Sequence, residues 1–130
     1  SVKGRNICVL GLTYKPGTST LRRSAALEVI SELAQEGAEV SASDPKADRV
    51  ELAAQRGFTF REDALDAVRG ADALVLMTPW ADFKALDFSA VRSAMRGDLV
   101  YDTANLWPAD AVAAAGLRYL DIGRSRAARR

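Results

Sequence analysis

The sequence predicts an α/β domain built on a mostly parallel sheet of about six strands, with helices on both faces. Two observations lead to this fold class. Short apolar runs alternate with segments whose apolar residues recur at helical spacing, an order typical of βαβ units. Most of the helical segments end at a glycine, which readily forms a left-handed helix cap. Because crossovers between parallel strands are right-handed, this order favours a doubly wound, Rossmann-like sheet.

The predicted strands are short apolar runs, and the clearest of them read as strands buried on both faces. They cover residues 6–10, 39–43, 58–60, 73–77, 99–102 and 117–122. The predicted helices include residues 26–34, 47–56, 64–68, 88–95 and 108–115, with Gly37 closing the first. Asp63 is a candidate N-cap, Gly97 ends the fourth helix, and residues 78–86 are predicted to form a loop.

The composition is that of an ordinary soluble domain. The 130 residues suit a single domain, here assigned to residues 1–124, with 48% hydrophobic and 27% charged residues. No apolar run approaches the roughly 20 residues of a membrane span, and the first residues form no signal peptide, so we expect a cytoplasmic protein. A net charge of +1 is unlike that of a nucleic-acid binder. Residues 125–130 are predicted to be a disordered basic tail.

Two absences restrict the chemistry. The chain has no histidine, which excludes Ser-His-Asp and Cys-His catalysis and the commonest zinc ligand. Its one cysteine, Cys8, lies inside an apolar run and is predicted to be an unreactive core residue. We therefore expect neither an internal disulfide nor a metal site.

The loop after the first strand is the most informative polar segment. Residues 11–24 read GLTYKPGTSTLRRS, which matches neither G-x-G-x-x-G nor a P-loop. Lys15, Arg22 and Arg23 lie close to the start of a helix, where cations and free N–H groups together favour an anion such as a diphosphate. A solvated basic loop explains the same residues, and the residues alone leave both interpretations open.

Three further residues have competing interpretations. Asp44 ends the second strand, where a dinucleotide-binding domain places the acid that binds a ribose, but without the glycine motif we favour a turn or helix N-cap role. Trp80 and Phe83 could stack on a base or form a subunit contact, and we favour simple packing of the loop.

Several short motifs, taken in order, resemble the C-terminal domain of the UDP-glucose/GDP-mannose dehydrogenase family. The loop resembles that family's G-x-[FY]-K-x-x-T-x-D-x-R-E-S motif, which leads into a helix. The other matching segments are VSASDP at 40–45, DALVLMTPW at 72–80, FKALD at 83–87, DTAN at 102–105 and YLDIGR at 119–124. The match spans about residues 3 to 124.

The resemblance implies a UDP-binding domain of an NAD-dependent nucleotide-sugar 6-dehydrogenase of the UDP-glucose to UDP-glucuronate type. Such enzymes oxidise a sugar C6 alcohol to a carboxylate, bind NAD in an N-terminal domain, and form a homodimer through a central helical region. By motif matching, Tyr14 and Lys15 contact the UDP-sugar, and Arg22 reaches the NAD of the other domain. Arg23 and two residues near the fifth strand, Asp102 and Asn105, are further candidates.

The chain also departs from the family pattern. Where the family's loop motif has an aspartate and a glutamate, this chain has Thr20 and Arg23. Gly17 takes the place of another acid, and Ala104 takes the place of the arginine in D-x-R-N. With these changes, the sequence does not decide which sugar is bound or whether the nucleotide is UDP or GDP. The family's catalytic-cysteine motif is absent, so we expect this chain to be inactive alone.

Two other functions remain open from the sequence. A stand-alone nucleotide-binding or regulatory module would need no catalytic residues, and a purely structural domain would tolerate the altered positions Thr20, Arg23 and Ala104. The chain starts at Ser1, almost on the first strand and without a methionine, so we expect a longer natural polypeptide.

Overall fold

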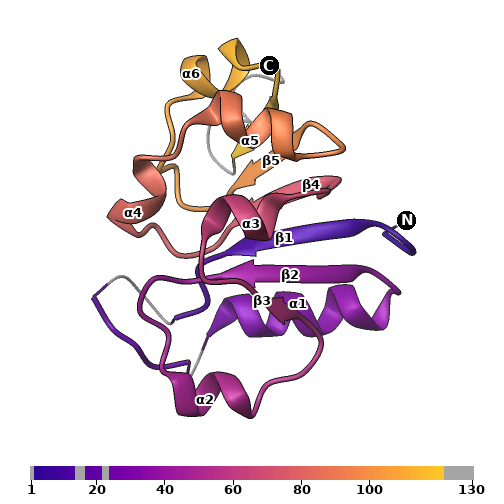
Figure 1. The fold of residues 1–130 in the computed structure, drawn as a ribbon, viewed down its shortest axis with the longest axis vertical. Coiled ribbons are helices and arrows are strands. Elements are labelled where there is room, and N and C mark those ends of the chain that lie inside the picture. The colour runs from indigo at the N-terminus through magenta and orange to yellow at the C-terminus, as the bar shows by residue number, and fades with distance from the viewer. Residues whose placement is uncertain (1, 14–16, 22–23, 122–130) are drawn as a thin grey trace.

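All six strands of the computed structural model run parallel, in the order β3-β2-β1-β4-β5-β6 (Figure 1). The structure describes residues 2–13, 17–21 and 24–121. The strands are β1 (Asn6–Leu10), β2 (Glu39–Ser43), β3 (Thr59–Phe60), β4 (Ala73–Leu76), β5 (Leu99–Asp102) and β6 (Arg118–Asp121). The chain starts in the middle of the sheet, moves outward to β3, and returns to add β4 beside β1. The strand order changes direction at this pair, which confirms the doubly wound sheet.

Helices cover both faces of the sheet. They are α1 (Ala25–Gln35), α2 (Arg49–Ala53), α3 (Ala64–Val68), α4 (Ala81–Lys84), α5 (Phe88–Ala94) and α6 (Ala109–Ala114). In Figure 1, α1 and α2 lie at one end of the view and α5 and α6 at the other. No helix within the described ranges is both long and apolar enough to cross a membrane.

Each face has its own hydrophobic cluster, because neighbouring residues of a strand point to opposite faces. Val9 of β1 packs with Ile30 of α1 on one face. Cys8 and Leu10, one residue to either side, pack on the other face with Val91 of α5. The central strand β1 is thus buried on both sides, as its apolar sequence predicts.

The predicted elements differ from the structure mainly at their ends. The second helix starts at Arg49 because Asp48, whose side chain accepts hydrogen bonds from the N–H groups of Val50 and Glu51, caps it. The segment predicted as a loop contains the short helix α4. Gly37 has a φ of 91° just after α1, which confirms its left-handed cap.

Two predicted end residues act differently from expectation. Asp63 precedes α3, but its side chain makes no capping hydrogen bond. The fourth predicted helix ends at Ala94, before Gly97. Gly97 is needed because a Cβ there would lie 2.2 Å from the carbonyl oxygen of Asp72. The requirement is close approach between two chain segments, which local sequence does not reveal.

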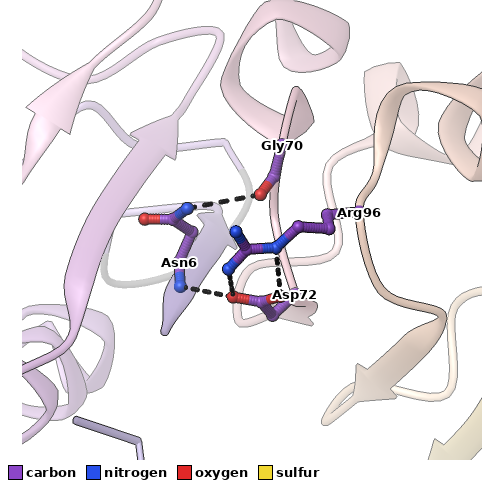
Figure 2. Close-up of polar contacts among 4 residues, drawn as sticks. All are labelled: Asn6, Gly70, Asp72 and Arg96. Carbon is purple, nitrogen blue, oxygen red and sulfur yellow. Dashed lines mark hydrogen bonds and ion pairs between the residues drawn. The ribbon is translucent and has the colours of Figure 1, made fainter. Parts of the chain in front are cut away.

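Asp72 joins three segments at the amino-terminal edge of the sheet (Figure 2). Its carboxylate accepts two hydrogen bonds from Arg96, at 2.9 and 2.8 Å, and one of 2.8 Å from the backbone N–H of Asn6. The Asn6 side chain donates to the carbonyl of Gly70. Chiefly through the Arg96 hydrogen bond, these contacts lower the pKa of the Asp72 carboxyl to about 2. The ionised carboxylate therefore ties the starts of β1 and β4 to the turn before β5.

We predict that Asp72 makes stability depend on pH. Its folded-state pKa of about 2 lies below the ordinary value of 3.8, so its stabilising contribution is complete above about pH 4 and is lost as the pH falls toward 2. Asp72→Asn should lower Tm near neutral pH, and the difference from the native protein should shrink below about pH 4.

Thermal unfolding followed by circular dichroism between about pH 2 and 7 measures this difference. Asp66→Asn is the matched control, because Asp66 forms an exposed ion pair with Arg69 of the kind that contributes little. Equal, pH-independent effects of the two substitutions would contradict the prediction.

Candidate functional site

The carboxyl ends of the strands form the candidate site. In open α/β sheets, ligands bind beyond these ends, near the change in strand order, which here lies between β1 and β4. The arrowheads of β1 and β2 point toward the side of the molecule on which α4 lies (Figure 1). The loops after β1, β2, β4 and β5 therefore meet at this edge.

One buried carboxylate holds three of these loops together. Oδ2 of Asp44, just after β2, accepts hydrogen bonds from the N–H groups of Leu12 and Thr13 at 2.7 and 3.1 Å. It also accepts one from the indole Nε1 of Trp80, after β4, at 3.2 Å. Oδ1 accepts from the N–H of Lys46 at 2.8 Å, which forms a local turn. The turn role predicted for Asp44 is confirmed, and the contacts between loops extend it.

The loops after β1 and β4 also contact each other directly. The hydroxyl of Thr78 donates to the carbonyl of Thr13 at 3.0 Å. Gly11 has a φ of 94°, and a Cβ there would lie 2.5 Å from the backbone nitrogen of Thr78. Glycine is therefore required at residue 11 by both conformation and space.

The start of α1 is bonded to the same loop. The hydroxyl of Ser24 donates to the carbonyl of Leu12 at 2.5 Å and accepts from the N–H of Leu27 at 3.2 Å. Ser24 is thus both the N-cap of α1 and an anchor for the first part of the loop. This arrangement holds the positive end of the α1 dipole against the loop.

The second part of the loop is anchored on α2. Oε1 of Glu51 accepts from the hydroxyl of Thr20 at 3.3 Å and from the N–H of Leu21 at 3.4 Å. The N–H of Asp48 donates to the carbonyl of Ser19 at 2.9 Å. Thr20, one of the departures from the family motif, thus has a structural contact. No role was predicted from the sequence for Glu51 or Asp48, although the position of Asp48 at the start of a helix is visible there.

Trp80 and Phe83 pack inside the domain. They are 8% and 3% exposed, and the carbonyl of Phe83 accepts a 2.8 Å hydrogen bond from Nε1 of Trp107. The packing interpretation is confirmed for both residues, because neither ring is exposed enough to stack on a base.

Asp102 shapes the loop after β5 from inside the protein. It is completely buried; its Oδ1 accepts from the N–H of Ala104, and its Oδ2 accepts from the N–H of Trp107 and the hydroxyl of Tyr119. Asn105, by contrast, is exposed and has a φ of 54°, a left-handed conformation that asparagine tolerates. A nucleotide contact remains a prediction for both, and the geometry favours Asn105 over Asp102.

The other predicted ligand residues, Tyr14, Lys15, Arg22 and Arg23, lie outside the described residues. Thr13 and Gly17 bound the segment 14–16, which contains the first pair, and Leu21 and Ser24 bound the second pair. Thr13, Leu21 and Ser24 are buried, so the chain on these sides of the two pairs is anchored in the domain.

The described residues do not fit NAD bound as a dinucleotide. The acid that would bind the ribose, Asp44, uses its carboxylate on backbone and indole N–H groups, and the loop lacks the glycine motif. Cys8 is completely buried, and burial raises the pKa of its thiol to about 12, which confirms it as an unreactive core residue.

Comparisons with known proteins agree with the motifs. Residues 8–109 match the model of the "UDP-glucose/GDP-mannose dehydrogenase family, UDP binding domain". The chain is 40% identical over 123 residues to the UDP-glucose 6-dehydrogenase of Rhizobium meliloti, covering 95% of this chain and 28% of that protein. It is 38% identical over 131 residues to that of Pseudomonas aeruginosa, covering 96% and 29%.

Solved structures show the same fold. A UDP-D-ManNAc dehydrogenase from Pyrococcus horikoshii superposes with a TM-score of 0.78 at 31% identity, covering 95% of this chain and 27% of that one. A UDP-glucose dehydrogenase from Pyrobaculum islandicum has a TM-score of 0.66 at 31% identity, covering 78% and 22%. The chain therefore spans less than a third of each of these four proteins.

We predict that Asp44→Ala destabilises the protein by roughly 3 kcal/mol, because it leaves buried N–H groups of Leu12, Thr13 and Trp80 without an acceptor. Urea unfolding measures the loss, and amide hydrogen exchange at Leu12 and Thr13 should become faster. Asp48→Ala is the control, since it removes an exposed helix cap worth about 1 kcal/mol. Equal losses in the two variants would contradict the role given to Asp44.

We further predict that Gly11→Ala is much more destabilising than Gly17→Ala. Both glycines have positive φ, 94° and 89°, but a Cβ at Gly11 meets Thr78 at 2.5 Å, whereas one at Gly17 meets no atom of the described residues within 4 Å. Gly17→Ala should cost only the conformational strain of about 1–2 kcal/mol. The same urea experiment compares the two, and similar midpoints would show that the close approach to Thr78 is easily relieved.

Proposed function

The chain belongs to the UDP-glucose/GDP-mannose dehydrogenase family, and we propose that it binds the UDP part of a UDP-sugar at the carboxyl edge of its sheet. The observation that carries this proposal is the match of residues 8–109 to the family's UDP-binding domain. That match includes the loop after β1 and the loops after β2, β4 and β5. These are the segments that the structure brings together.

The anchoring of the loop supports an anion site. Asp44, Ser24 and Thr78 hold residues 11–13 in place, and Tyr14 and Lys15 follow directly in the sequence. The N-terminus of the 11-residue helix α1 begins at the same loop. A lysine in a loop that leads to a helix N-terminus attracts a diphosphate through its charge, and the free N–H groups of that terminus add to the attraction.

The hydrogen bonds of Asp44 support a mode of nucleotide binding that differs from that of a dinucleotide-binding domain. The carboxylate that would select a ribose hydroxyl holds the loop after β1 instead. Recognition of the nucleoside must then come from other groups at this edge, and the exposed Asn105 is the described candidate. Its amide can both donate and accept hydrogen bonds, as uracil requires.

We assign the complete activity to a longer polypeptide. By analogy with the relatives, that protein is an NAD-dependent dehydrogenase that oxidises the C6 alcohol of a UDP-sugar, of which UDP-glucose is the first candidate. NAD is bound mainly by another domain, with Arg22 of this chain reaching toward it. The partners are that domain and a central dimerisation region, in a cytoplasmic homodimer. This chain contributes binding and orientation of the substrate, a role that raises the effective concentration of the reacting groups.

We predict that UDP added to the 130-residue chain shifts the NMR signals of residues at the carboxyl edge, including Thr13 and Asn105. Lys15→Ala should weaken binding by about tenfold, the effect of losing one charge-assisted phosphate contact. Arg69→Ala is the control, because it removes the same charge from the end of α3, beside the amino-terminal edge. In the complete dehydrogenase, Lys15→Ala should abolish activity while the fold is retained.

Two outcomes would count against the proposed function. One is normal kinetics of the Lys15→Ala dehydrogenase. The other is an equal loss of UDP affinity in the Lys15→Ala and Arg69→Ala chains, which would indicate general attraction by charge rather than a site. Competition by GDP in the same titration decides between the two nucleotides.

A further inference from the structure

The sheet has a region that no described helix covers. Parallel sheets in proteins are almost always covered on both faces. On the face that carries α1, the helix packs against β2 and the residues of β1. Buried residues of α4, α5 and α6, which follow β4 and β5, all belong to the cluster on the opposite face: Phe83, Val91 and Val112. No helix among residues 2–13, 17–21 and 24–121 therefore covers the α1 face of β5 and β6.

Large apolar side chains lie on this uncovered region. Val75, Tyr101 and Leu120 are register partners across β4, β5 and β6, so their side chains point to the same face. Val75 pairs with Val9, which packs in the α1 cluster. Tyr101 is 40% exposed and Leu120 38%. We call these three residues the open row.

Exposure of Tyr101 is unusual because β5 is an interior strand, paired on both sides. The opposite face, over β2 and β3, has a hollow of about 580 Å³ beside α3, and its lining includes the polar residues Glu39, Ser41, Thr59 and Arg61. The open row has apolar residues instead. Because interior strands of parallel sheets are almost always covered on both faces, an exposed apolar side chain on β5 points to a missing cover.

We propose that the open row is covered by an amphipathic helix from the part of the dehydrogenase polypeptide that this chain does not span. The inference rests on the proposed function, under which such a polypeptide exists. The chain covers 28% of the Rhizobium meliloti relative and 29% of the Pseudomonas aeruginosa relative. Each of these relatives is a single, longer protein. A helix is the element that covers parallel sheets elsewhere in this fold, and its apolar face would complete the second side of β5 and β6.

The size of the row argues against a second copy of the chain as the occupant. An aromatic side chain has about 150–250 Å² to bury, so 40% exposure of Tyr101 leaves on the order of 100 Å². A stable interface needs about 800 Å² from each partner. A covalently attached segment needs far less area, because linkage supplies an effective concentration on the order of millimolar.

Cysteine labelling tests the proposal, because the only native cysteine of this chain is completely buried. Leu120→Cys and Tyr101→Cys place a thiol on the open row, and Val50→Cys places one on α2, where Val50 is 82% exposed. Each variant is treated with a maleimide in two forms, the 130-residue chain and the complete dehydrogenase polypeptide. Peptide mass spectrometry measures labelling at the introduced residue.

We expect both open-row thiols to react rapidly in the 130-residue chain and more than about tenfold more slowly in the complete polypeptide, where a helix must open first. Val50→Cys should react at similar rates in both. Equal rates for the open-row thiols in the two forms would overturn the proposal. Slow labelling in the 130-residue chain that becomes faster on dilution would also overturn it, since the occupant would then be a second copy. UDP binding does not enter this measurement, so failure of the proposed function is detected separately by the nucleotide titration.

Discussion

The buried carboxylate of Asp44 is the contact on which the candidate site depends. A single side chain, 4% exposed, accepts hydrogen bonds from the loops after β1, β2 and β4. A buried ionisable group is tolerated only when its hydrogen bonds are made, and here its partners are backbone and indole N–H groups. These hydrogen bonds hold the described parts of the three loops together at this edge of the sheet.

Aspartate carboxylates accept hydrogen bonds at both edges of the sheet, but they serve different purposes there. At the amino-terminal edge, the carboxylate of Asp72 is bonded to Arg96 and to the N–H of Asn6, so it joins chain segments where no ligand is expected. At the carboxyl edge, Asp44 and Asp102 each accept hydrogen bonds from N–H groups of the adjoining loops. Acids that a motif search would assign to a ligand thus serve to position the backbone. Among the described residues at this edge, Asn105 is exposed and is a predicted ligand contact, and Tyr14, Lys15, Arg22 and Arg23 stay predictions from the sequence.

The described residues agree with the match to a UDP-binding domain. Cys8 is unreactive, and the acid that would bind a ribose in a dinucleotide site already accepts hydrogen bonds from the loops. We propose that the uncovered apolar row of the domain packs against other parts of the same protein. A shared fold alone would not establish a role in UDP binding, because the same sheet serves many functions.

The sequence by itself determined the order of elements, the doubly wound sheet and the family. Those features follow from apolar periodicity, from glycines after helices and from short motifs, all of which are local along the chain. It also predicted that Cys8 and Trp80 pack inside. Only the tertiary structure decided what the acids do, since Asp44 and Leu12 are 32 residues apart and Asp72 and Arg96 are 24 apart. The close approach at Gly97 and the uncovered face at Tyr101 are likewise set by which strands and helices become neighbours, a property that local residue patterns do not contain.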